Sequence, residues 1–208
     1  MSPAPASSPN KISTHQRILR AAKKLFASRG YEHTSTSAIA RQASTSESQL
    51  MKHFGSKAGL LEAIFNEGWG EITEAAQAAS ENLSPPAEKL LAIAGSALRR
   101  LELDQELKRL VLLEGRRIRR EGPSVALTDG FLGFVGLIDS AVGEMRDLNL
   151  LLPGLDPQAV RSALMGMLEG VMRDRYLAEQ LHFPADFQMA QVEEMLGLVL
   201  ASFTVHEA

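Results

Sequence analysis

The chain has 208 residues, 45% of them hydrophobic, and it contains no cysteine. A chain of this kind can bury a core, and the lack of cysteine excludes disulfides, a thiol nucleophile and cysteine-based metal sites. No apolar run approaches the roughly 20 residues of a membrane-spanning helix, and the first residues lack the apolar region of a secretory signal, so we expect a cytoplasmic protein.

Charge divides the chain into two parts. The net charge is −3, but residues 1–60 contain nine lysines and arginines against two acidic residues, which gives +7. The remaining residues carry −10. A basic N-terminal part on an acidic body indicates that the N-terminal part alone contacts a polyanion such as DNA; the alternative is a small helical domain that is basic by chance.

The N-terminal part begins with an arm and a helix. Residues 1–13 are rich in Pro, Ser and Ala without periodicity and are expected to be disordered. A helix is predicted from Thr14, its cap, to about Ser28, and Gly30 is expected to end it in a left-handed conformation. Its buried stripe at helical spacing comprises Ile18, Ala22, Leu25 and Phe26.

The stretch from Ser35 to Phe54 predicts two short helices joined by a tight turn. Ser35 and Ser46 are each expected to cap a helix, and Gln49 follows Ser46 at the spacing of a capping box. Residues 44–46 favour a turn because their side chains compete with helical hydrogen bonds. The second helix turns a largely polar face outward, formed by Glu47, Ser48, Gln49, Met51, Lys52 and His53. A helix-turn-helix DNA-binding unit is therefore predicted.

The rest of the chain predicts an all-α body, because no segment shows the alternation of a β-strand. Helices are expected at about residues 57–79, 87–103, 104–120, 124–148, 156–180 and from 187 onward. Gly68 and Gly70 interrupt the first of these helices. Either a neighbour packs closely there, or the helix contains a soft joint.

Two features of the body have open interpretations. Glu114 falls on a buried stripe, where a carboxylate is costly unless it is paired. It either pairs with an arginine of the body or binds a cationic or hydroxylated effector. A basic cluster closes the same helix, either as a solvated helix end or as a site for a phosphate-bearing effector. The cluster comprises Arg116, Arg117, Arg119 and Arg120.

No catalytic constellation is present in the sequence. The five histidines are scattered without metal-ligand spacing, and neither a glycine-rich phosphate loop nor a Gly-x-Ser-x-Gly motif occurs. We therefore expect no enzyme activity, no metal and no cofactor.

The segment from Ile18 to Phe65 carries a further pattern. It contains Ile-Leu and Ala-Ala in the first helix, then Leu-Phe, Gly-Tyr, Ile-Ala, Leu-x-x-His-Phe and a following Lys. In order and spacing this pattern resembles the tetracycline-repressor (TetR-like) family of transcriptional regulators, while the rest of the chain matches that family only in architecture. The matching positions are Ile18, Ala21, Ala22, Leu25, Phe26, Gly30, Tyr31, Thr34, Ser35, Ile39, Ala40, Leu50, His53, Phe54, Lys57 and Leu61.

The resemblance implies which residues contact DNA. Thr34 and Ser35 stand where the family contacts phosphate, and free N–H groups at a helix N-terminus favour an anion there; simple capping is the alternative. Gln, Lys and Glu side chains can read adenine, guanine and cytosine edges. For Gln49 the alternative to a base contact is a role in capping the helix. For His53 the alternative to a phosphate contact is a histidine that is partly packed in the domain. The expected DNA-binding residues are Thr34, Ser35, Arg41, Ser46, Glu47, Ser48, Gln49, Lys52, His53 and Lys57.

Two positions depart from the family pattern. Ser44 replaces the usual glycine of the turn, and a left-handed conformation is costly for serine. Met51 replaces the usual tyrosine. Because methionine cannot donate a hydrogen bond, one phosphate contact is lost or passes to Lys52.

The resemblance also implies a division into a DNA-binding domain at 14–58, after the disordered arm, and an effector-binding and dimerisation domain at 59–208. A mostly apolar effector pocket is expected from Trp69, Leu110, Glu114, Phe131, Phe134, Met165 and Met172. A smooth face of small residues and the last helix are expected to pair with a second copy. The expected interface residues are Ala163, Gly166, Gly170, Leu196, Val199 and Phe203.

The expected function is that of a dimeric helix-turn-helix regulator, specifically a repressor, that binds a palindromic operator and is released by a small, mostly apolar effector. Double-stranded DNA, a small molecule and a second copy of the chain are the expected partners, and a membrane is not. The alternative is a helical lipophile-binding or interaction protein whose N-terminal domain no longer binds specific DNA.

Overall fold

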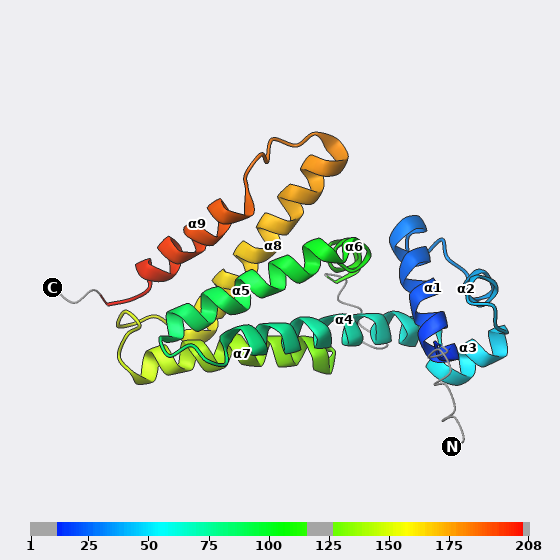
Figure 1. Cartoon of the computed structure of the whole chain (residues 1–208), viewed down its shortest axis with the longest axis horizontal. Coiled ribbons are helices and arrows are strands. Elements are labelled where there is room, and N and C mark those ends of the chain that lie inside the picture. The colour runs from blue at the N-terminus through cyan, green and yellow to red at the C-terminus, as the bar shows by residue number, and fades with distance from the viewer. Residues whose placement is uncertain (1–11, 116–126, 206–208) are drawn as a thin grey trace, which may run out of the picture. The chain divides into compact units, whose positions relative to one another are not determined.

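The computed structural model describes residues 12–115 and 127–205, and every regular element in these residues is a helix (Figure 1). The predicted all-α fold is thus confirmed. The chain divides into two compact units, Met1–Ile64 and Phe65–Ala208, which we call the N-terminal unit and the C-terminal unit. None of the described helices is both long and apolar enough to cross a membrane.

The N-terminal unit contains α1 (Thr14–Arg29), α2 (Thr36–Gln42), α3 (Glu47–Phe54) and the start of α4 (Lys57–Ser80). Its core is made where the helices meet, and the fully buried side chains are Ile18, Ala22, Phe26, Ile39, Leu50, Leu60 and Leu61. Gly30 ends α1 with φ of 85°, and Gly55 ends α3 with φ of 72°, a conformation that glycine adopts without strain.

The cap of α1 differs from the prediction by one residue. Ser13, not Thr14, is the N-cap, and its hydroxyl accepts a hydrogen bond from the Gln16 backbone N–H at 3.1 Å. The Gln16 side chain in turn accepts from the Ser13 backbone N–H, which completes a capping box. Thr14 could not form this reciprocal pair, because the residue three positions after it is Arg17.

The C-terminal unit contains the rest of α4 and five further helices: α5 (Pro86–Leu103), α6 (Gln105–Glu114), α7 (Asp129–Asp147), α8 (Pro157–Leu181) and α9 (Met189–Ser202). Helix α5 packs against α7 and α9, and α8 packs against α6 and α7. One isolated antiparallel bridge, between Leu151 and Thr204, ties the loop after α7 to the end of α9.

Most helix starts in this unit follow the predicted caps. The side chain of Asp104 accepts from the Leu107 backbone N–H, and that of Asp156 accepts from Gln158 and Ala159. Helix α7 is capped by Thr128, later than the predicted start near Ser124. The predicted extension of the preceding helix to Arg120, its arginine cluster and the Ser124 start lie outside the described residues.

Helix α4 continues without a break through Gly68 and Gly70. A Cβ atom built on Gly68 would lie 2.6 Å from a methyl carbon of Leu107, so α6 packs onto α4 at this glycine. At Gly70 the helix is equally close to α7, because a Cβ atom on Gly130 would lie 2.7 Å from the Gly70 nitrogen. Close packing of a neighbour therefore accounts for Gly68, and on the α7 side it accounts for Gly130, whereas a Cβ atom on Gly70 would have nothing within 4 Å.

Candidate DNA-binding surface and effector cavity

The N-terminal unit builds its two short helices through serine caps. The Ser35 hydroxyl accepts from the Ala38 backbone N–H, and the Ser46 hydroxyl accepts from the Gln49 backbone N–H, each at 3.2 Å. Between them Ser44 adopts φ of 51°, the left-handed conformation. The α2–α3 turn therefore has the left-handed conformation that glycine usually adopts, although its residue at this position is a serine.

Helix α3 presents a polar surface, as its spacing predicts. Leu50 is fully buried and Phe54 is half-buried, so these two side chains fix α3 to the rest of the unit. The exposed side chains are those predicted to face outward: Glu47, Ser48, Gln49, Met51, Lys52 and His53. A short capped helix with this exposed set has the shape required to enter a major groove.

One of these side chains already contacts α2. The Thr36 hydroxyl donates a hydrogen bond to a carboxylate oxygen of Glu47. This contact links the first residue of α2 to the first residue of α3, so Glu47 braces the two helices. The Glu47 carboxylate would have to break its hydrogen bond with Thr36 before it could accept a hydrogen bond from a cytosine amino group.

Two predicted phosphate contacts are used inside the unit. Thr34 is 2% exposed, and its hydroxyl donates to the carbonyl oxygens of Gly30 and Leu25 at 2.8 and 3.3 Å. The Lys57 ammonium donates to the carbonyl oxygens of Tyr31 and Thr34 at 3.0 and 3.2 Å, and it lies 4.3 Å from the centre of the Tyr31 ring. Both side chains therefore hold the connection between α1 and α2 in place.

Other basic and aromatic groups near α2 and α3 were not singled out by the sequence. The His15 ring of α1 lies 5.7 Å from the His53 ring and 4.6 Å from the Phe54 ring. A shallow groove of about 290 Å³ runs along α1 beside the α2–α3 turn, and it carries three exposed cations without an acidic residue. They are Arg17, Arg20 and Lys24, whose spacing places them on one helical face.

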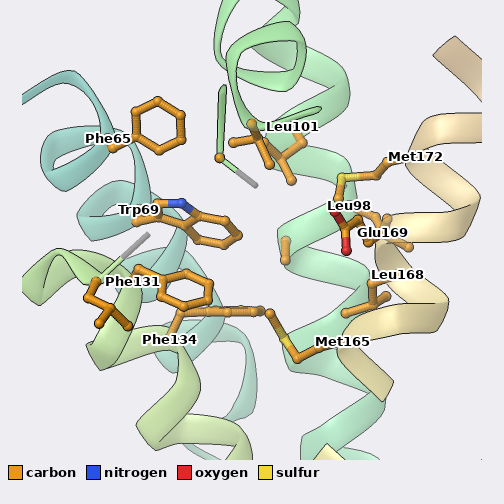
Figure 2. Close-up of a pocket in the computed structure, with 14 residues that line it drawn as sticks. Phe65, Trp69, Leu98, Leu101, Phe131, Phe134, Met165, Leu168, Glu169 and Met172 are labelled. Atoms are coloured by element: carbon orange, nitrogen blue, oxygen red, sulfur yellow. The ribbon is translucent and has the colours of Figure 1, made fainter. Parts of the chain in front are cut away.

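The C-terminal unit holds a partly open, apolar cavity of about 280 Å³ (Figure 2). Trp69 forms the centre of an aromatic wall, with its ring 5.0 Å from Phe131 and 5.3 Å from Phe134. The opposite side is formed by α5 and α8. The residues that line the cavity are Phe65, Trp69, Ala97, Leu98, Leu101, Val111, Gly115, Leu127, Phe131, Phe134, Met165, Leu168, Glu169 and Met172.

Five of the seven residues predicted for the pocket line this cavity: Trp69, Phe131, Phe134, Met165 and Met172. Leu110 and Glu114 do not, because both side chains are buried elsewhere in α6, at 1% and 7% exposure. Glu114 makes an interaction of its own there. The prediction omitted Glu169, although its spacing of four from Met165 and three from Met172 places it on the same face of α8.

A charged cluster that was not predicted links α5, α6 and α8. Lys108 of α6 is fully buried, and its ammonium contacts the carboxylates of Glu102 and Glu179 at 3.4 and 3.3 Å. Arg175 of α8 donates to Glu102 at 3.1 Å and to the Phe187 carbonyl oxygen, also at 3.1 Å. These groups join the ends of α5, α6 and α8, so a buried lysine is fully paired.

The residues predicted for pairing with a second copy divide into two sets. Ala163 and Gly166 of α8 are exposed, and nothing lies within 4 Å of a Cβ atom built on Gly166 or Gly170. Val199 and Phe203 of α9 are partly exposed. Leu196 is 1% exposed and packs inside the unit with Leu90, Ile93 and Leu200, so it cannot contact a second copy; Leu198, at 68% exposure, faces outward instead.

Comparisons with known proteins agree with this architecture. Residues 18–64 match the family described as bacterial regulatory proteins, tetR family. The "Probable HTH-type transcriptional regulator YttP" of Bacillus subtilis is 26% identical over 184 residues, which cover 86% of this chain and 89% of that protein.

Two solved structures share the fold of this chain. FadR from Bacillus subtilis in complex with stearoyl-CoA has a TM-score of 0.76 at 20% identity, covering 91% of this chain and 98% of FadR. AibR in complex with isovaleryl coenzyme A and operator DNA has a TM-score of 0.68 at 22% identity, covering 91% and 99%.

The fold and the capped α2–turn–α3 unit define a helix-turn-helix transcriptional regulator. Its N-terminal segment, residues 18–64, is that of the tetR family of bacterial regulatory proteins.

Proposed function

We propose that the protein is a repressor that binds a palindromic operator as a homodimer and is released by a small, mostly apolar effector. The observation that carries this proposal is the combination of an exposed, serine-capped α3 with a separate unit that holds an apolar cavity. The solved structure of AibR with an acyl coenzyme A and operator DNA is an example of a similar fold bound to both kinds of partner.

Base recognition is assigned to the exposed face of α3. Gln49 suits adenine, and Lys52 suits guanine or a phosphate. Ser35, Arg41, Ser46, Ser48 and His53 are assigned to the phosphate backbone, together with the α1 cations beside the turn. Thr34 and Lys57 support the surface from within, and Glu47 is available for a base only when it leaves Thr36.

The homodimer is assigned to the exposed small-residue face of α8 together with the outward face of α9. Gly166 and Gly170 leave open space in which the helix of a second copy can come close. A dimer places two α3 helices in successive major grooves, so the operator should be a palindrome with half-sites about one helical turn apart or more.

Release requires that the effector binds one conformation of the C-terminal unit more tightly than another. Helix α4 carries residues of both units, from Lys57 to Ser80, and Trp69 on this helix lines the cavity. An effector in the cavity therefore contacts the same helix that closes the DNA-binding unit.

The proposal is tested by selecting bound sites from random duplex DNA with the full chain, followed by titration at two salt concentrations. We expect a palindrome, and an affinity that falls steeply with salt because each neutralised phosphate contributes about −0.9 to the logarithmic slope. Gln49→Ala should relax specificity at one position with the slope unchanged, whereas Gln77→Ala, on the exposed face of α4, should change neither. Weak binding without sequence preference would contradict the proposal and favour the lipophile-binding alternative.

A further inference from the structure

Helix α3 carries one apolar side chain on its exposed surface, Met51. It is 43% exposed, whereas Leu50 is fully buried and Phe54 half-buried. The other exposed side chains of α3 are polar or charged. A single exposed methionine is common on protein surfaces, but on this helix its position decides what it meets when α3 enters a major groove.

The spacing along α3 places Met51 beside Glu47. The two residues are four apart, so their side chains lie one turn apart on the same side of the helix. The Glu47 carboxylate accepts a hydrogen bond from Thr36, so this is the side of α3 next to α2. The cation that follows, Lys52, projects about 100° further round the helix. The α2 side of α3 therefore combines an apolar side chain with a negative charge.

This combination disfavours a phosphate group at Met51 and favours a base edge. A thioether cannot donate a hydrogen bond to a phosphate oxygen, and the Glu47 carboxylate one turn away repels the phosphate charge. Among the groups that base pairs present in the major groove, the C5-methyl group of thymine is the apolar one, and it is recognised by apolar contact. Methionine is unbranched and flexible, so it can adapt its shape to a methyl group.

We infer that Met51 reads the C5-methyl group of a thymine in each half-site of the operator. This inference rests on the proposed function, because it adds a further specificity-determining residue to operator recognition by α3.

The test uses the full chain and the palindrome that is selected from random duplex DNA. Each thymine, on either strand, is replaced by deoxyuridine in both half-sites together, which removes the methyl group and keeps the base pairing. Burial of one methyl group contributes about fourfold in affinity, so we expect one position at which the loss is about 16-fold for the two half-sites. The inference is overturned if the half-site contains no thymine, or if deoxyuridine has no effect at any thymine.

Variants of α3 connect this loss to Met51. Alanine is too short to cover the methyl group, so Met51→Ala should bind the thymine and deoxyuridine operators within about twofold of each other, whereas Met51→Leu should keep most of the difference. Gln49→Ala is the matched control on α3: it should weaken binding to both operators equally and keep their ratio. Each variant is compared with itself on two DNAs, so a general loss of affinity does not mimic the result. A ratio that survives in Met51→Ala, or that also disappears in Gln49→Ala, contradicts the role of Met51.

A methyl group on another base provides an independent check. At the sensitive position the T·A pair is replaced by C·G, either with cytosine or with 5-methylcytosine. The methyl group of 5-methylcytosine returns to the same edge of the major groove, so it should raise the affinity of the unmodified chain about fourfold for each half-site. Met51→Ala should show no such gain. Equal binding of cytosine and 5-methylcytosine by the unmodified chain would overturn the inference.

These measurements separate the inference from the proposed function. If no palindrome is recovered, operator binding itself fails and the inference fails with it. If a palindrome is bound with a steep salt dependence but no thymine methyl group is required, the proposed function stands and only the role of Met51 is overturned. The same conclusion follows if Met51→Ala weakens binding to the thymine and deoxyuridine operators to the same extent, because Met51 then contacts the sugar–phosphate backbone.

Discussion

At the scale of single residues, the N-terminal unit combines a strained turn with a basic side chain that is used internally. Ser44 holds φ of 51° in the α2–α3 turn, and Lys57 directs its ammonium to two carbonyl oxygens of the α1–α2 connection. Both residues lie within the segment that matches the tetR family. Each therefore affects the geometry of the DNA-binding surface without being a base-reading group.

Ser44→Gly should stabilise the N-terminal unit by about 0.5 kcal/mol. Glycine relieves the left-handed strain of about 1–2 kcal/mol, and its larger loss of chain entropy on folding offsets part of that gain. Amide hydrogen exchange of α1–α3 measures the change. Ser37→Gly, the same substitution at a helical position of α2, should destabilise the unit instead. Slower exchange in both variants, or in neither, would argue against strain at Ser44.

Lys57→Met should destabilise the N-terminal unit by about 1–3 kcal/mol, because two carbonyl oxygens lose a charged donor. The salt slope of operator binding should stay the same, since the Lys57 ammonium already has partners within the protein. Lys52→Met, on the exposed face of α3, should show the reverse: unchanged stability and a slope reduced by about 1. A reduced slope in Lys57→Met would instead make Lys57 a phosphate contact.

At the scale of elements, α4 is shaped by what packs on it. Leu107 of α6 contacts α4 at Gly68, and Gly130 of α7 crosses it near Gly70. The Thr73 hydroxyl donates to the Gly130 carbonyl oxygen at 3.0 Å, and the Gly130 N–H donates to the Asn66 side chain at 2.8 Å. These contacts hold Trp69, between the two glycines, at the wall of the cavity.

Gly68→Ala and Gly70→Ala should have opposite effects on the stability of the C-terminal unit. A methyl group at position 68 would lie 2.6 Å from Leu107, so this buried side chain must move, at a cost of about 1–3 kcal/mol. At position 70 nothing lies within 4 Å, so alanine should stabilise the helix by about 0.5–1 kcal/mol. Urea unfolding followed by Trp69 fluorescence measures both. Equal effects would show that propensity alone, and not packing, governs these positions.

At the scale of the whole molecule, the proposed homodimer depends on a surface that one chain leaves open. The small residues Gly166 and Gly170 of α8 have no neighbour where a side chain would lie, and Leu198 of α9 is exposed. An apolar, small-residue surface of this kind is suited to close pairing with an identical helix pair.

Gly166→Trp should shift the chain toward the monomer by at least about tenfold in dimer dissociation, because a bulky side chain keeps the facing helices apart. Sedimentation equilibrium measures the shift, and circular dichroism should show an unchanged helical fold. Gly136→Trp is the matched control on α7, where the glycine is also exposed with open space around it. A shift of the same size in both variants, or in neither, would place the interface elsewhere.

The sequence by itself determined the helical class, the helix-turn-helix and most caps, because these depend on local spacing and on side chains that bond to their own backbone. Together with the family resemblance, which implies an apolar effector pocket, it also named five of the residues that line the cavity. Charge and family resemblance together were enough to indicate a DNA-binding regulator.

Only the tertiary structure decided what each side chain does once helices distant in sequence meet. Lys57 contacts Tyr31 and Thr34 across more than 20 residues, and Leu196 faces Leu90 and Ile93 rather than a second copy. Helical periodicity predicts that a residue is buried, but it does not predict whether the residue is buried in the core of its own unit, at the cavity or against a second copy. For the same reason the structure, and not the sequence, placed Glu169 at the cavity and Glu114 away from it.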